Sequence, residues 1–164
     1  MTGVVWQATS LDVGPEGRRP YPCRPPMTDN INWRDARAPS LEDFERLAAE
    51  AWERLPEHFR QLCSDVIVRI DDFATDEVLQ ELGIESPFDL MGLYQGVSLD
   101  KRSFSDLPRQ PDMVFLYRRA ILDYWADSDD TLGDIVTHVL VHEIGHHFGF
   151  SDEDMERIEA SAKS

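Results

Sequence analysis

The stretch VHEIGHHFGFSDED, residues 141–154, combines metal-binding residue types with a spacing that suits a helix. His142 and His146 are four residues apart, so on a helix both imidazoles lie on one face, one turn apart. Two nitrogens placed in this way can reach one zinc ion at about 2.0–2.1 Å each. Glu143 projects to the side of the pair, where it can act as general base on a metal-bound water. This HExxH pattern therefore predicts a hydrolytic metal site.

The helix that must carry these residues is predicted from about Ser128 to Gly149. Within residues 135–150 Glu143 is the only formally charged residue. Apolar residues recur at helical spacing along this segment and predict a largely buried helix, namely Leu132, Ile135, Val136, Val139 and Leu140. An isolated carboxylate in such a helix costs several kcal/mol to desolvate, or more, unless it is paired. The position of Glu143 therefore indicates a functional site.

Two histidines do not complete a zinc site, so a third protein ligand is expected. A glutamate on a separate later helix is one solution, but only 18 residues follow His146, which leaves it little room. The other solution is a sharp turn after the helix. Gly149 can adopt the positive φ that ends a helix, and Asp152 then lies where the ligand is needed. The full pattern HExxHxxGxxD predicts His142, His146 and Asp152 as ligands of one Zn²⁺ ion.

The acidic cluster after Gly149 has a second interpretation. Ser151 can serve as the N-cap of a last helix, with Asp152 and Glu153 as ordinary acids of its first turn. Capping does not exclude ligation, and Glu153 and Asp154 are the alternative ligands if Asp152 is not one.

Two further histidines lie on the same predicted helix. His138 precedes His142 by one turn and is interpreted as a core or second-shell histidine. His147 points about 100° away from His146 and is interpreted as structural.

The composition narrows the class of protein. The chain has 164 residues, 41% of them hydrophobic, and a formal net charge of −16. Such a charge repels phosphate backbones, so we expect no nucleic-acid partner. We expect no membrane partner either, because no run is long and apolar enough to span a bilayer. The N-terminus lacks the features of a signal peptide and the two cysteines do not suit a disulfide, so a cytoplasmic monomer is expected.

Residues 1–39 differ from the remainder and are predicted to form a flexible tail. The segment GPEGRRPYPCRPP, residues 14–26, is too rich in proline and glycine to bury much apolar surface. Met27 offers an alternative start, so residues 1–26 are a candidate for sequence upstream of the native coding region. Residues 40–164 are predicted to form the folded domain.

The folded domain is predicted to be α+β. A helix follows Ser40, which resembles a capping box with Asp43. Other elements are expected in DVIVRIDDF (strand), TDEVLQELG (helix), LMGLYQGVSL and PDMVFLYRRAI (strands), and SDEDMERIEASA (helix).

The motif VHEIGHHFGFSDEDM resembles that of a bacterial family of minimal zincin-like metallopeptidases, whose physiological function is unassigned. The segments LMGLYQGVSLDKRSFSD and PDMVFLYRRAI are also similar to this family, so the resemblance covers roughly residues 40–160. It implies a small mixed sheet packed on an N-terminal helix and a buried active-site helix. It also implies His142, His146 and Asp152 as zinc ligands and Glu143 as general base. Met155 comes too early to be equated with the methionine turn of metzincins and is expected to pack beneath the last helix.

The expected function is zinc-dependent hydrolysis of a peptide or protein substrate, by a metal-activated water with Glu143 as base. An edge strand could hold the extended peptide, with PDMVFLY as first candidate and LMGLYQG as second. Tyr117 and Tyr94 are candidates for stabilising the oxyanion, although ordinary strand packing explains both. The alternative function is a zinc-binding interaction or regulatory module with a zincin fold and no peptide turnover.

Overall fold

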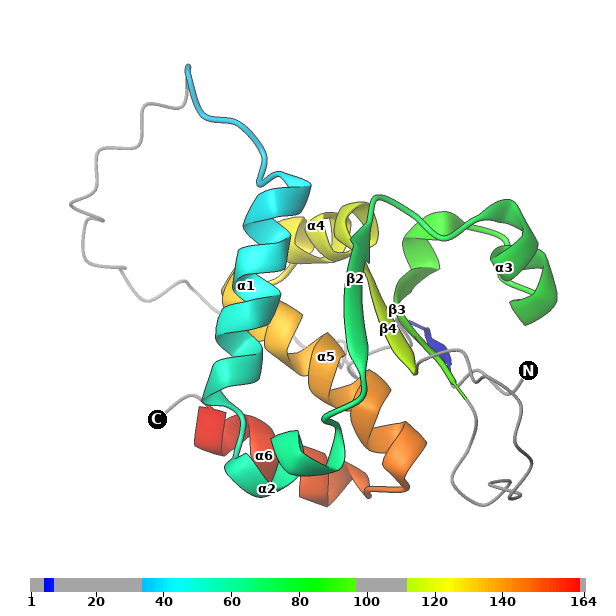
Figure 1. The fold of residues 1–164 in the computed structure, drawn as a ribbon. Coiled ribbons are helices and arrows are strands. Elements are labelled where there is room, and N and C mark those ends of the chain that lie inside the picture. The colour runs from blue at the N-terminus through cyan, green and yellow to red at the C-terminus, as the bar shows by residue number, and fades with distance from the viewer. Residues whose placement is uncertain (1–4, 8–33, 97–111, 163–164) are drawn as a thin grey trace, which may run out of the picture.

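The computed structural model describes residues 5–7, 34–96 and 112–162 (Figure 1). Its elements follow the order β1 (Val5–Gln7), α1 (Leu41–Arg54), α2 (Glu57–Leu62), β2 (Ile67–Asp71), α3 (Asp76–Leu82), the 3₁₀ helix η1 (Pro87–Asp89), β3 (Leu90–Gln95), β4 (Met113–Tyr117), α4 (Arg118–Asp127), α5 (Leu132–Phe148) and α6 (Asp152–Ala162). The predicted α+β class is confirmed. No helix within the described ranges is both long and apolar enough to cross a membrane.

The sheet is mixed and has the strand order β1-β3-β4-β2. β2 runs parallel to β4, whereas β3 is antiparallel to both β4 and β1. The prediction that PDMVFLY is an edge strand is wrong, because β4 is paired on both sides, with β3 and with β2. Its main chain therefore cannot receive an added peptide. The second candidate, LMGLYQG, contains β3, which is not an edge strand in the structure either, because it pairs with β4 on one side and with β1 on the other.

Local signals place several elements where the sequence predicts them. Ser40 and Asp43 form the predicted capping box of α1, with the Ser40 hydroxyl accepting from the Asp43 N–H at 3.1 Å. Thr75 caps α3, and Gly83 ends that helix with φ +69°. These positions follow from side-chain chemistry within a few residues, so they do not depend on the remainder of the fold.

The structure differs from the prediction at α4, because the strand predicted over residues 111–121 ends at Tyr117. Arg118 begins the helix and is held there by long-range contacts. Its Nε donates to Asp72 Oδ1 at 2.7 Å, and its Nη1 donates to the carbonyl oxygen of Pro39 at 2.8 Å. Partners this far away in the sequence give no local signal, so the sequence pattern does not show that the strand ends before Arg118.

A second difference is β1, which lies in the segment predicted to be a flexible tail. Residues 5–7 pair with β3 and become the outermost strand of the sheet. The proline-rich segment that suggested a tail, residues 14–26, lies outside the described residues.

Helix α5 occupies the centre of the domain. It packs against α1 and α6, and it also contacts β3 and β4, so it connects these two helices to the sheet (Figure 1). Its apolar side chains are buried as predicted, among them Ile135, Val136, Val139, Leu140, Val141 and Ile144. Met155 of α6 is fully buried and packs on α5 at Gly145, where an added Cβ would lie 2.4 Å from Met155 Sδ. The predicted packing role of Met155 is confirmed.

Candidate metal centre

Both ends of α5 are fixed by local hydrogen bonds. At the start, the Thr131 hydroxyl accepts from the Asp134 N–H at 3.2 Å, which satisfies an N–H that has no partner within the helix. At the end, Gly149 adopts φ +74° and the Phe150 N–H donates to the Gly145 carbonyl at 3.0 Å. This is the Schellman arrangement, so the predicted role of Gly149 in ending the helix is confirmed. The histidines therefore sit on a rigid helix with defined ends.

Glu143 faces the sheet from α5. Its side chain is 1% exposed, and Oε2 accepts a hydrogen bond from the backbone N–H of Tyr94 at 3.0 Å. β3 comes close to α5 here, because a Cβ on Gly92 would lie 2.8 Å from Glu143 Cγ. The predicted general base is thus buried and oriented by the main chain of β3.

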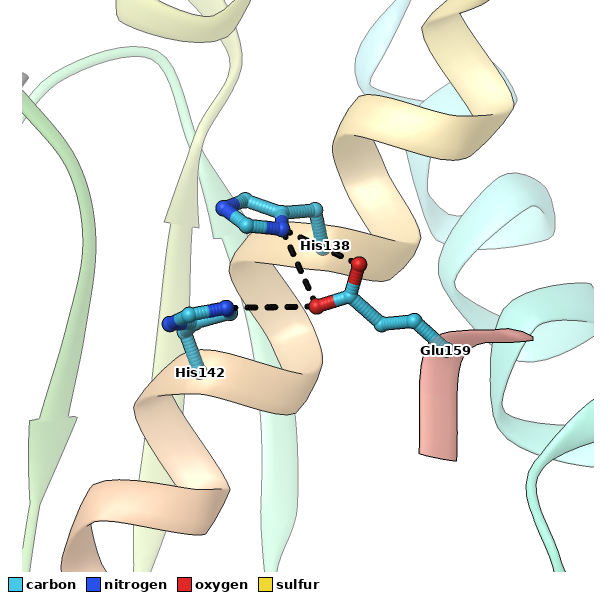
Figure 2. A group of neighbouring side chains, drawn as sticks. All are labelled: His138, His142 and Glu159. Atoms are coloured by element: carbon cyan, nitrogen blue, oxygen red, sulfur yellow. Dashed lines mark hydrogen bonds and ion pairs between the residues drawn. The ribbon is translucent and has the colours of Figure 1, made fainter. Parts of the chain in front are cut away.

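A second face of α5 carries a group of two histidines that meet a carboxylate from α6 (Figure 2). His138 Nδ1 lies 3.0 Å from Glu159 Oε1 and 3.1 Å from Oε2, and His142 Nε2 lies 3.2 Å from Oε1. The two imidazole rings are stacked at a tilt, with centroids 4.0 Å apart. Burial opposes ionisation of Glu159, but the hydrogen bonds and charges of both histidines outweigh it and lower its pKa to about 2. Glu159 is therefore a carboxylate at neutral pH.

The buried Glu143 beside this group, on a helix under a small mixed sheet, matches what the resemblance implied. The sequence profile of the zincin-like metallopeptidase family matches residues 63–162. The chain belongs to this family. Comparison with curated proteins gives no match. The matched part of this zincin-like chain runs from the end of α2 to α6 and so includes β2, β3, β4 and α5.

The structure describes the side chains of only two of the three predicted zinc ligands. His142 is nearly buried and lies in the group with Glu159. His146 lies one turn further along α5, and its side chain is outside the described part of the chain. Asp152 is exposed as the first residue of α6, and the group found among the described residues does not include it. The set of His142, His146 and Asp152 thus stays a prediction.

The start of α6 bears out the capping interpretation of the acidic cluster. The Ser151 hydroxyl accepts from the Asp154 N–H at 3.3 Å and donates to Asp154 Oδ2 at 2.6 Å. These bonds to Ser151, together with Arg157, lower the pKa of Asp154. The Asp154 carboxylate is therefore engaged by the cap, which makes it a poor alternative ligand, whereas Asp152 is an exposed residue at the start of α6.

The sequence reasoning did not identify Glu159. A glutamate on a later helix was set aside for lack of room, yet α6 turns back on α5 at once and brings Glu159 beside His142. A signal was present, because Met155, Ile158 and Ala162 mark the buried face of α6. Glu159 is four residues after Met155 and so lies on or next to that face, which makes it a partly buried acid.

The donors on this face suit a zinc ion. Two imidazoles and one carboxylate are a ligand set found in catalytic zinc sites, and the ligand atoms of His138, His142 and Glu159 all lie within 4.8 Å of one another. Ligands at about 2.1 Å from a tetrahedral ion lie roughly 3.4 Å apart, which is close to the 3.0 and 3.2 Å between Glu159 Oε1 and the nearest nitrogens of His138 and His142. The residues present therefore fit the zinc that the family implies.

The two candidate tyrosines are buried strand residues. Tyr94 is 1% exposed and Tyr117 is 3% exposed. Burial raises the pKa of the Tyr117 hydroxyl, and the nearby carboxylates of Asp71 and Glu143 raise it further. Tyr117 thus stays protonated, and packing accounts for both positions.

Proposed function

We propose that this zincin-like protein hydrolyses peptide bonds in a zinc-dependent reaction. The observation that carries the proposal is the state of Glu143. A carboxylate that is 1% exposed on a central helix is costly unless it has a role, and this one is held by the Tyr94 N–H directly beside His142. A purely structural zinc site needs no such base.

Each side chain of the site has a distinct proposed role. His142, His146 and Asp152 are the proposed zinc ligands, and a bound zinc ion supplies Lewis acidity that activates water and polarises a carbonyl group. Glu143 takes a proton from the attacking water and delivers it to the leaving amine. The hydrogen bond from the Tyr94 N–H holds the Glu143 carboxylate in one orientation for both proton transfers.

A second ligand set is favoured by a specific observation. His138, His142 and Glu159 already converge in the structure, and two imidazoles with one glutamate form a catalytic type of zinc site. In this arrangement Glu159 replaces Asp152 and His138 replaces His146. In the first arrangement, Glu159 and His138 instead orient His142 from outside the ligand shell.

The first experiment tests the function. Zinc content and peptide turnover are measured for the unaltered chain and for Glu143→Gln, which keeps the size of the side chain and an acceptor for the Tyr94 N–H. We expect zinc to be retained and turnover to fall by at least about 10²-fold, the usual contribution of a general base. Equal turnover in both proteins would contradict the role of Glu143, and no turnover by the unaltered chain would favour a zinc-binding interaction module.

The second experiment separates the two ligand sets with four conservative variants, measured by competition with a zinc chelator. His146→Asn and Asp152→Asn are expected to weaken zinc binding more than about 100-fold, because each removes a ligand. His138→Asn and Glu159→Gln are expected to weaken it about 10–100-fold, the range for residues that only orient a ligand. The reverse pattern would assign the ion to His138, His142 and Glu159.

A further inference from the structure

β1 fills a position that the rest of the domain leaves open. Among the strands that the structure describes, the order without β1 would be β3-β4-β2, and none of them would pair with the outer edge of β3. Val5 is in register with Leu93, Trp6 with Gly92 and Gln7 with Leu90, so three residues of the N-terminal segment pair with this edge. An extended segment added to an exposed edge is the usual way in which a sheet binds a peptide.

The same strand carries the contact to the proposed base. Tyr94 of β3 donates its N–H to Glu143, and Gly92 lies against the Glu143 side chain. Trp6 is in register with Gly92, so β1 runs antiparallel to β3 next to the residue of β3 that is packed on Glu143. A peptide paired with this edge would lie directly beside the strand that contacts Glu143.

The edge and the strand that fills it belong to different parts of the chain. The region matched by the family profile, residues 63–162, contains β3 and β4 but not β1. The zincin-like domain therefore provides the open edge, and the N-terminal segment of this chain supplies the strand.

The pairing is suited to displacement. It spans three residues and is interrupted by a register shift between Trp6 and Gln7, so few main-chain hydrogen bonds hold it. Because β1 is part of the same chain, its effective concentration at the edge is on the order of 1 mM. A strand that binds weakly can still fill the edge most of the time at this concentration.

We propose that residues 5–7 occupy, as an internal competitor, the edge of β3 that receives the extended backbone of a peptide substrate. The identity of the site as a substrate site rests on the proposed function. Displacement of β1 is then a step that precedes substrate binding, and it raises the apparent dissociation constant of any peptide. If residues 5–7 bind the edge with a dissociation constant of ~100 µM, their effective concentration of ~1 mM raises the apparent dissociation constant of the peptide about 10-fold.

The test uses the full chain with two double variants. V5P/W6P removes the N–H groups of both positions and prevents pairing, whereas V5A/W6A keeps those N–H groups and is the matched control. The probe is a fluorescently labelled peptide of residues 1–10, MTGVVWQATS, and its binding is followed by anisotropy in Glu143→Gln proteins, which do not cleave it. Hydrogen exchange of the amides of Leu90–Leu93 is measured in parallel.

We expect the proline variant to bind the probe about 10-fold more tightly than the unaltered sequence, with faster exchange along Leu90–Leu93 when no probe is present. The alanine variant should show a smaller change in both. Equal binding and equal exchange in the proline and alanine variants would overturn the proposal. With Glu143 restored, the proline substitution is expected to lower KM for peptides at unchanged kcat. Absence of turnover would contradict the proposed function alone, because probe binding and exchange do not depend on it.

Discussion

The close approach of β3 to α5 makes Gly92→Ala the most informative single substitution in the chain. A Cβ at this position would lie 2.6 Å from Val139 Cγ1 and 2.8 Å from Glu143 Cγ. Carbon atoms in contact prefer about 3.5–4.0 Å, so the shortfall is about 1 Å on both. Val139 is 1% exposed on the central helix, and a branched side chain held there has little freedom to move away. Either β3 or α5 must shift.

The expected magnitude follows from two opposing terms. Overpacking of a buried contact costs about 1–3 kcal/mol, whereas replacing glycine inside a strand by alanine gains about 0.5–1 kcal/mol. We therefore expect Gly92→Ala to lower the free energy of unfolding by about 1–2 kcal/mol. In urea this corresponds to a decrease in the midpoint of roughly 0.5–1 M. Turnover should fall as well, because the clash displaces Glu143.

A double-mutant cycle identifies the cause. Val139→Ala removes the nearest clashing atom and, because Val139 is buried, costs on the order of 2 kcal/mol by itself. In the double variant, the loss should be smaller than the sum of the single losses by about 1 kcal/mol. Gly133→Ala is the control, because its Cβ would meet nothing closer than Thr131 Oγ1 at 4.0 Å and should stabilise α5. Additive effects in the cycle, or an unchanged midpoint for Gly92→Ala, would refute the reasoning.

Three further predictions concern helix ends and the buried thiol. Gly83→Ala and Gly149→Ala each force alanine into positive φ, +69° and +74°, with no neighbour within 4 Å of the added Cβ. Urea unfolding should show that each variant loses about 1 kcal/mol of unfolding free energy. Competition with a chelator should show weaker zinc binding only for Gly149→Ala. Ser151→Ala removes the cap of α6 and should lower stability by about 1 kcal/mol in the same assay; no change would contradict the role of the cap. Burial raises the pKa of the Cys63 thiol to about 12, so the unfolded thiol ionises at a lower pH than the folded one. In a Cys23→Ser chain the urea midpoint should therefore fall as pH rises from 9 toward 12. Cys63→Ala should make that fall smaller, and the part that remains comes from groups such as Tyr117, whose pKa burial also raises.

The parts of the fold that the sequence predicted are those with local causes. The cap at Ser40, the helix end at Gly149 and the buried face of α5 depend on residues a few positions apart, and the structure has all of them. The helix α4 was missed because Arg118 is held by Asp72 and Pro39, far away in the sequence. The pairing of β1 was missed for a related reason, since a three-residue strand carries too little periodicity to be recognised.

The candidate site follows the same rule, because its features with local causes were predicted and those that depend on distant packing were not. The spacing of His142 and His146 on a helix led to the motif. In the structure Glu143 is buried and accepts a hydrogen bond from the Tyr94 N–H, and its role as the base stays a prediction. Glu159 was not found, because its approach to His142 depends on how α6 folds back on α5. That return is set by the turn at Gly149 and by the packing of Met155, and the sequence shows the turn but not the direction that follows it.

The contact between Gly145 and Met155 also changes how the motif itself is understood. The two spacer positions of HExxH are usually written as free, yet here Ile144 is fully buried and Gly145 has no room for a side chain beneath Met155. The spacer is therefore part of a helix–helix interface, and a side chain at residue 145 requires the Met155 side chain to move or to be smaller. A graft of the motif onto another helix would have to carry both sides of that interface, and related chains with a larger residue at 145 should have a smaller one at 155.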